Sequence, residues 1–290
     1  MSDPRAFEPY RYASPCGRLS LFARIYPGEG ETLLLMHGLT RNSADFEPLA
    51  AHLAGRYRLI VPDQRGRGLS DYDSNAGNYR PDIYCADMLA LLDGLGVERA
   101  GLIGTSMGGL MAMILAATAP ARFPAVILND VGTELDPAGI ARIQGYVGPA
   151  PAFATWEDAA ARCGAINHEA FPDFGPADWL AFARRTCVEG ADGRVRFAYD
   201  PGISASIKGD QPETVPPNLW PLWDALSAKP VLVLRGALSD LLAPDTVRRM
   251  KDRHSGPFET IDVPRRGHAP LLDEPAALAA IEAFLRDHVG

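Results

Sequence analysis

Ser106 is the residue whose surroundings point most directly to chemistry. It lies between Gly104 and Gly108, after the apolar segment 100–103 and before the helix-forming segment 110–117. This pattern predicts a strand, a sharp turn and a helix, with the serine at the apex. Glycines are needed on both sides because strand and helix approach too closely for larger side chains. The pattern therefore predicts a nucleophilic serine. A phosphate-binding loop does not fit, since no lysine follows the glycines.

A serine hydroxyl becomes a good nucleophile when a base takes its proton and a third group orients that base. The histidines downstream of Ser106 are His168, His254, His268 and His288. His268 lies in a loop between the last predicted strand, near 258–263, and the last predicted helix, 275–288. This position places it at the same sheet edge as Ser106. We therefore predict that His268 is the general base.

The acid that orients the base is expected in the loop after the predicted strand 230–235, where the sequence has Asp240. Two other carboxylates compete with it. Asp130 ends the preceding predicted strand, and Asp245 stands at a predicted helix start, where capping explains its presence. Asp240 is the predicted acid, and Asp130 is the alternative.

Attack on a carbonyl group creates an oxyanion, which needs donors that are already in place. The backbone N–H of Met107, directly after the nucleophile, is one candidate donor. The second is the N–H of Leu39, in the loop that follows the apolar segment 32–36. His37, in the same loop, is expected to shape the loop rather than to act in catalysis.

Apolar strand-like segments alternate with predicted helices up to about residue 131, which indicates βαβ units and a mostly parallel sheet. Residues 132–225 contain helical stretches without a core strand, and the alternation then resumes. An insertion at this place is expected to cover the carboxyl edge of the sheet, where open α/β sheets bind ligands. The predicted organisation is a core of residues 1–131 and 226–290 with a helical cap of residues 132–225.

Five motifs together resemble the α/β-hydrolase fold family, in particular its small bacterial members with a helical cap. They are His37-Gly38, the loop 63–70 (DQRGRGLS), the elbow 104–109 (GTSMGG), Ser239-Asp240 and Gly267-His268. The resemblance covers nearly the whole chain outside the insertion. It implies the α/β-hydrolase fold with flanking helices, a Ser-His-Asp triad in the order serine, acid, histidine, and no cofactor or metal.

Departures from subfamily patterns narrow the expected reaction. Haloalkane dehalogenases and epoxide hydrolases carry aspartate at the elbow, where this chain has Ser106. Carbon–carbon bond hydrolases usually place tryptophan after the catalytic histidine, where this chain has Ala269. A carboxylesterase or lactonase acting on a small or medium acyl substrate is the prediction. A carbon–carbon hydrolase, a perhydrolase or acyltransferase, and a non-enzymatic ligand receptor are the alternatives.

Residues near the predicted site suggest how a substrate is held. Arg41 and Arg65 lie on loops at the active edge and are candidates to meet a substrate carboxylate, although structural ion pairs explain them at least as well. Trp156 and Trp179 in the insertion are candidates for an apolar wall, together with three phenylalanines, Phe171, Phe174 and Phe182.

Composition limits the possible partners. The chain has 290 residues, a formal net charge of −8 and a pI near 5.3, so no basic surface is expected for nucleic acid. No segment has the length and apolar character of a membrane helix, and no signal peptide is recognised at the N-terminus. The four widely spaced cysteines are expected to be free thiols. A cytoplasmic protein with a small-molecule ester or lactone substrate is the expectation; nothing in the sequence predicts its oligomeric state.

Overall fold

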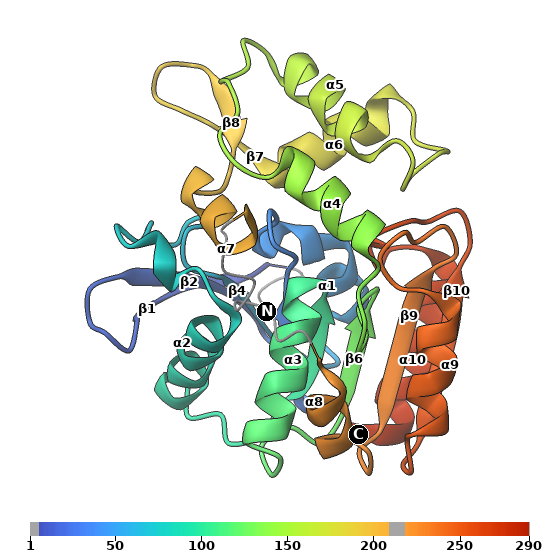
Figure 1. Ribbon diagram of the computed structural model, residues 1–290. Coiled ribbons are helices and arrows are strands. Elements are labelled where there is room, and N and C mark those ends of the chain that lie inside the picture. The colour runs from blue at the N-terminus through green and yellow to red at the C-terminus, as the bar shows by residue number, and fades with distance from the viewer. Residues whose placement is uncertain (1–5, 209–217, 290) are drawn as a thin grey trace.

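The computed structural model describes residues 6–208 and 218–289 and contains an eight-stranded sheet at its centre (Figure 1). The strand order is β1-β2-β4-β3-β5-β6-β9-β10. The six strands from β4 onwards are mutually parallel, and β1 and β2 extend the sheet as an antiparallel hairpin. The strand bounds are β1 (Glu8–Ala13), β2 (Ser20–Tyr26), β3 (Thr32–Met36), β4 (Arg58–Asp63), β5 (Gly101–Thr105), β6 (Val126–Asn129), β9 (Val231–Gly236) and β10 (Phe258–Val263).

Helices cover both faces of this sheet, which explains why its central strands are continuously apolar. One face packs against α1 (Glu47–Leu53) and α10 (Pro275–His288). The opposite face packs against α2 (Pro81–Gly94), α3 (Met107–Thr118), α8 (Trp220–Ala225) and α9 (Pro244–Asp252). The fold is the predicted α/β class with a mostly parallel sheet.

Residues 137–208, which follow β6, lie over the carboxyl ends of the parallel strands, as Figure 1 shows. They contain α4 (Pro137–Tyr146), α5 (Trp156–Asn167), α6 (Pro176–Thr186), the hairpin β7 (Cys187–Glu189) and β8 (Val195–Phe197), and α7 (Ala205–Lys208). α5 and α6 bury aromatic residues in a cluster of their own. α8, which also falls within the predicted cap, packs instead against α3 in the main core through the fully buried Trp223. The cap boundaries stay a prediction.

The register of the strands aligns the points where the functional loops begin. Met36 of β3 pairs with Gly104 of β5, and Thr105 pairs with Asn129 of β6. Asn129 in turn pairs with Leu234 of β9. The residues that follow these strand ends therefore leave the sheet at one edge, beneath α4. The described residues also form three short 3-10 helices: Ser43–Phe46, Ala76–Asn78 and Pro201–Ser204.

Two further expectations concern the chain as a whole. All four cysteines are free thiols, as predicted. None of the helices in the described part of the chain combines the length and the hydropathy needed to cross a membrane.

Candidate active site

The turn between β5 and α3 is the tight elbow predicted from the glycines. Ser106 has φ +53° and ψ −115°, a left-handed backbone conformation that non-glycine residues rarely adopt. A Cβ atom at Gly104 would collide with the backbone of Gly108, and one at Gly108 would collide with the carbonyl group of Met36. The glycines thus allow β5 and α3 to approach closely, and this geometry holds the Ser106 hydroxyl above the sheet.

Ser106 belongs to a continuous chain of hydrogen bonds through His268 to Asp130. Ser106 Oγ lies 2.8 Å from His268 Nε2, and His268 Nδ1 lies 2.7 Å from Asp130 Oδ2. Asp130 is fully buried, and its carboxylate also accepts hydrogen bonds from Gly236 N at 2.7 Å and Ser239 Oγ at 2.6 Å. These donors fix the carboxylate, which in turn orients the imidazole ring toward the serine.

Asp240 is not the partner of His268, so the prediction of Asp240 as the acid is corrected to the alternative, Asp130. Asp240 pairs with Arg142 of α4, with its Oδ2 2.5 Å from Nε and its Oδ1 2.8 Å from Nη2. The hydrogen bonds from Arg142 lower the pKa of Asp240. α4 lies so close to this loop that a Cβ atom at Gly139 would collide with the Asp240 backbone. The inserted helix α4 therefore supplies the ion-pair partner of Asp240, and that partner is Arg142 rather than His268.

The loop that carries His268 is anchored to the end of β6. Asn129 is buried, and its side-chain amide donates to Pro270 O at 2.8 Å and to Thr105 Oγ1 at 3.0 Å. The backbone carbonyl oxygen of Asn129 accepts a hydrogen bond from Ser106 N. One side chain at the end of a strand thus links the histidine loop to the elbow, and nothing in the sequence pattern pointed to it.

The loop after β3 places the Leu39 amide beside the elbow. A Cβ atom at Gly38 would lie 3.8 Å from Ser106 Cβ, so this loop touches the nucleophile. Gly38 O lies 2.7 Å from His37 Nδ1 and accepts the Arg41 N–H. Because N–H and C=O point in opposite directions across a trans peptide, these contacts direct the Leu39 N–H away from His37. Within the described residues, the Leu39 and Met107 amides have no hydrogen-bond acceptor.

Arg67 anchors the same loop through a hydrogen bond to the Leu39 carbonyl group. The sequence pattern did not predict this role. The Arg67 side chain is fully buried, and Nε donates to Leu39 O at 2.9 Å. Nη1 donates to Tyr84 Oη at 2.8 Å, and Nη2 lies 3.7 Å from Met107 Sδ. Arg67 therefore contacts both residues predicted to supply oxyanion donors. Its position in the loop after β4, at the carboxyl edge of the sheet, could have indicated a role near the site.

His37 is neutral in the folded protein, because burial lowers its pKa to about 3 from an ordinary value of 6.5. Its Nε2 accepts a hydrogen bond from Gln64 N at 3.2 Å, so Nδ1 carries the proton that Gly38 O accepts. Protonation of Nε2 would break the contact with Gln64 and bury an additional charge.

We expect the free energy of unfolding to depend on pH because of His37. Between pH 6.5 and about 3 the unfolded chain protonates His37 and the folded chain does not. The contribution of His37 to the free energy of unfolding is therefore complete above pH 6.5 and decreases as the pH falls, by up to about 1.4 kcal/mol per pH unit. Urea unfolding of wild type and His37→Asn across this range measures the difference in slope. Equal slopes for wild type and His37→Asn would contradict the assignment.

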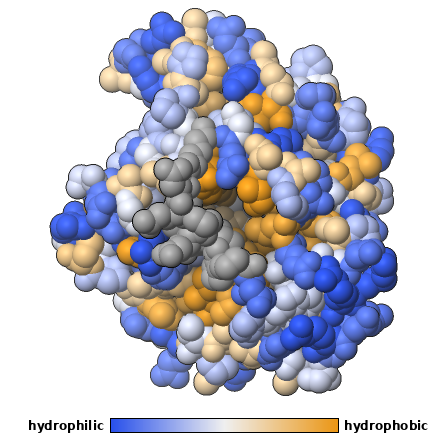
Figure 2. Space-filling model, viewed as in Figure 1, coloured by the Kyte–Doolittle hydropathy of each residue, from blue (hydrophilic) through white to orange (hydrophobic). Residues whose placement is uncertain are grey.

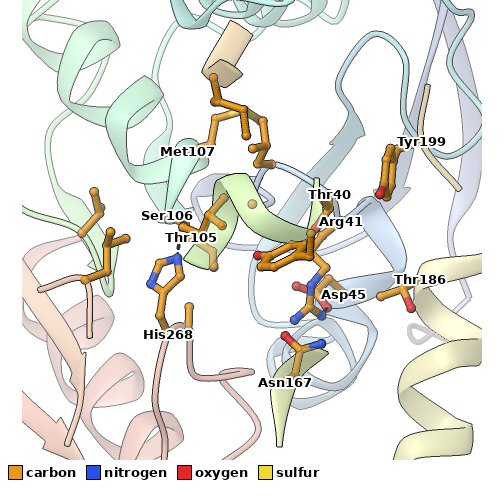
Figure 3. Close-up of a pocket in the computed structure, with 18 of the residues that line it drawn as sticks. Thr40, Arg41, Asp45, Thr105, Ser106, Met107, Asn167, Thr186, Tyr199 and His268 are labelled. Atoms are coloured by element: carbon orange, nitrogen blue, oxygen red, sulfur yellow. Dashed lines mark hydrogen bonds and ion pairs between the residues drawn. The ribbon is translucent and has the colours of Figure 1, made fainter. Parts of the chain in front are cut away.

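A cavity of about 140 Å³ lies between the elbow and the inserted helices. Ser106 and His268 lie on one side of it, and Arg41 and Asp45 lie on the other (Figure 3). The walls are mostly apolar and include Ile140 and Ile143 of α4 as well as Leu110 and Val131 of the core. Hydrophobic side chains also gather in the hollow between the upper helices and the core in Figure 2. The volume is below the roughly 300–1,000 Å³ of pockets for drug-sized ligands, which suits a small substrate.

The structure separates the predicted substrate-binding residues. Arg41 lines the cavity, as do Leu39 and Met107. Arg65 does not line it, because its buried guanidinium binds Asp87 and Asp73.

The prediction that Trp156 and Trp179 line the pocket is corrected by their packing. Trp156 donates to Glu189 Oε2 and stacks with Arg184, while Trp179 packs against the cap phenylalanines. Neither tryptophan is among the cavity-lining residues of the described chain; Phe182 of α6 lines it instead.

Comparison with known proteins places this arrangement in a family. Residues 31–174 match the family model described as the alpha/beta hydrolase fold. The 3-hydroxybutyrate-oligomer hydrolase of Cupriavidus necator is 37% identical over 263 residues, which cover 89% of each chain. The 2-(acetamidomethylene)succinate hydrolase of Mesorhizobium japonicum is 30% identical over 228 residues, 78% of this chain and 77% of that protein.

A solved structure agrees over almost the full length. The crystal structure of an alpha/beta hydrolase from Novosphingobium aromaticivorans superposes with a TM-score of 0.90 and 44% identity, over 97% of this chain and 98% of that chain. The identity and coverage of these relatives, together with the sheet order and the elbow, show that the chain belongs to the α/β-hydrolase fold family.

Proposed function

We propose that this protein hydrolyses small carboxylic esters or lactones through an acyl intermediate on Ser106. The observation that carries the proposal is the hydrogen-bonded chain Ser106–His268–Asp130 at the wall of an apolar cavity. A serine activated in this way attacks carbonyl carbon, and the roles of base and acid follow from the geometry. The relative from Cupriavidus necator is a 3-hydroxybutyrate-oligomer hydrolase, which supports an ester substrate.

The reaction proceeds in two halves. His268 Nε2 takes the proton of Ser106 Oγ as the oxygen attacks the carbonyl carbon, and Asp130 stabilises the imidazolium that forms. The Leu39 and Met107 amides receive the oxyanion of the tetrahedral intermediate. The intermediate collapses, the carbonyl–alkoxy bond breaks, and His268 gives its proton to the departing alcohol. Water then attacks the acyl carbonyl carbon while His268 takes its proton. The bond to Ser106 Oγ breaks, His268 returns the proton to that oxygen, and the carboxylic acid leaves.

The test is direct detection of the acyl-enzyme. The enzyme is mixed with p-nitrophenyl esters from acetate to decanoate, quenched in acid, and analysed by peptide mass spectrometry. We expect the mass of the acyl group on the peptide that contains Ser106, and a preference for short chains because the cavity is small. A pre-steady-state burst of p-nitrophenol without a labelled Ser106 would contradict the acyl-serine route.

The same preparation addresses the alternative reactions. Exchange of water for peroxide or an alcohol as acceptor, with analysis of the products, reveals perhydrolase or acyltransferase activity. A coloured dienoate substrate reports carbon–carbon cleavage. Retention of a ligand without turnover of any ester would favour a receptor and contradict the proposed function.

A further inference from the structure

Arg41 gives the cavity a positive group opposite the nucleophile. Of the described residues that line the cavity, Arg41 is the sole arginine or lysine. It lies in the loop between β3 and α1, and its side chain is 14% exposed. Figure 3 shows Arg41 beside Asp45 and near Asn167, apart from His268. An arginine in a mostly apolar cavity is destabilising unless it binds a ligand or a structural partner.

The structural partner occupies part of the guanidinium and leaves the rest available. Nη1 donates to Asp45 Oδ1 at 2.8 Å, and Cζ lies 4.1 Å from the ring centre of Phe182. In the described chain, Nε and Nη2 of Arg41 donate no hydrogen bond to the protein. Both atoms are also accessible, since they are absent from the fully buried polar atoms that have no partner. Asp45 and Phe182 thus fix the orientation of the group, and its Nε–Nη2 edge has the geometry that binds a carboxylate through two parallel hydrogen bonds.

The position of Arg41 relative to Ser106 limits the length of the ligand. A Cβ atom at Gly38 would lie 3.8 Å from Ser106 Cβ and 3.8 Å from Arg41 Cγ. The two side chains therefore start no more than twice that distance apart. The guanidinium extends beyond Cγ, and it lines the same cavity of about 140 Å³ as Ser106, so one small ligand can contact both groups.

We propose that Arg41 is a specificity residue that binds a free carboxylate on the substrate, so that the preferred esters are short and anionic. This inference rests on the proposed ester hydrolysis and adds the charge of its substrate. Two types of short ester carry a free carboxylate: a half-ester of a dicarboxylic acid has the anion on the acyl half, and an O-acyl hydroxy acid has it on the alcohol half.

The experiment compares anionic esters with neutral analogues of nearly the same shape. Ethyl hemisuccinate is paired with ethyl succinamate, and 3-acetoxybutyrate is paired with 3-acetoxybutyramide, with acid release followed by pH-stat titration. We expect the wild-type enzyme to have a higher kcat/KM for the anion than for the amide in at least one pair. That pair shows whether the carboxylate bound by Arg41 belongs to the acyl half or to the alcohol half of the ester. Arg41→Gln should lower the anion-to-amide ratio of kcat/KM about tenfold to a hundredfold, mainly through KM.

Two further variants separate charge from shape. Arg41→Lys keeps the charge but loses the two-pronged geometry, so it should restore part of the ratio. The matched control is Arg184→Gln, which removes one positive charge from the exposed surface of α6, and its ratio should equal that of wild type. An equal loss on the anion and on the amide in Arg41→Gln would overturn the proposal, as would a wild-type enzyme that prefers neither anion.

A binding measurement keeps this inference separate from the proposed function. Calorimetry with the Ser106→Ala variant measures the affinity for 3-acetoxybutyrate and for ethyl hemisuccinate without turnover. Adding Arg41→Gln to this variant should weaken the binding of the preferred anion by a similar factor. If the neutral esters acylate Ser106 but no anion binds through Arg41, the proposed function stands and the carboxylate subsite is wrong.

Discussion

Replacement of Ser106 by alanine is expected to lower kcat for ester hydrolysis about a millionfold. The proposed route requires a covalent bond to Ser106 Oγ, and His268 Nε2 has no other protein hydroxyl at hydrogen-bond distance in the described chain. Removal of a serine nucleophile from a comparable triad has an effect of this size, and the oxyanion donors alone sustain only a small residual rate. Steady-state hydrolysis of p-nitrophenyl butyrate with a high enzyme concentration measures the residual activity.

Alanine is the appropriate substitution because it keeps the Cβ atom in the strained turn at φ +53°. The variant should therefore unfold at nearly the wild-type urea concentration. The second variant, Ser106→Gly, relaxes the strain and should be equally inactive. If the alanine variant keeps more than about one hundredth of the activity while remaining folded, water attacks the substrate directly or another residue is the nucleophile.

Replacement of Asp130 by asparagine is expected to lower kcat about ten thousandfold. The asparagine amide has nearly the same shape as the carboxylate, but it carries no charge to stabilise the imidazolium. It also favours the imidazole tautomer in which Nε2 is protonated, and that tautomer cannot accept the proton of Ser106. The measurement is again kcat for a p-nitrophenyl ester, followed across the pH range.

The matched control for Asp130→Asn is Asp240→Asn, the same chemical change in the loop beside it. Its carboxylate binds Arg142, so we expect less than a tenfold change in kcat. If Asp240→Asn proves the more damaging of the two, Asp240 serves His268 in solution and the arrangement in the structure is not the active one.

The placement of Ser106 and His268 side by side could be predicted from the sequence because local rules determine their positions. Gly104 and Gly108 are required by the backbone at Ser106, and the loop between the last strand and the last helix can hold only His268. The choice between Asp130 and Asp240 could not be made in this way. It depends on Arg142, which lies in the inserted segment and approaches Asp240 only in the folded chain.

The walls of the cavity were harder to predict for a related reason. Trp156 and Trp179 have the composition expected of an apolar pocket, yet aromatic side chains on adjacent helices bury one another first. Isoleucines of α4, which no motif marks, face the cavity instead. Arg67 was also missed, because its importance comes from contacts with Leu39 and Met107, which belong to two different loops.

The hydrogen-bonded chain at the active site joins parts of the polypeptide that are synthesised far apart in time. Ser106 and His268 are 162 positions apart, and the carboxylate of Asp130 is held by Gly236 and Ser239. A nascent chain that has left the ribosome only as far as β6 has the elbow but neither the base nor the groups that fix the acid. Catalytic competence is therefore a late event of biosynthesis, and in refolding experiments the recovery of turnover reports completion of the sheet rather than formation of its first half.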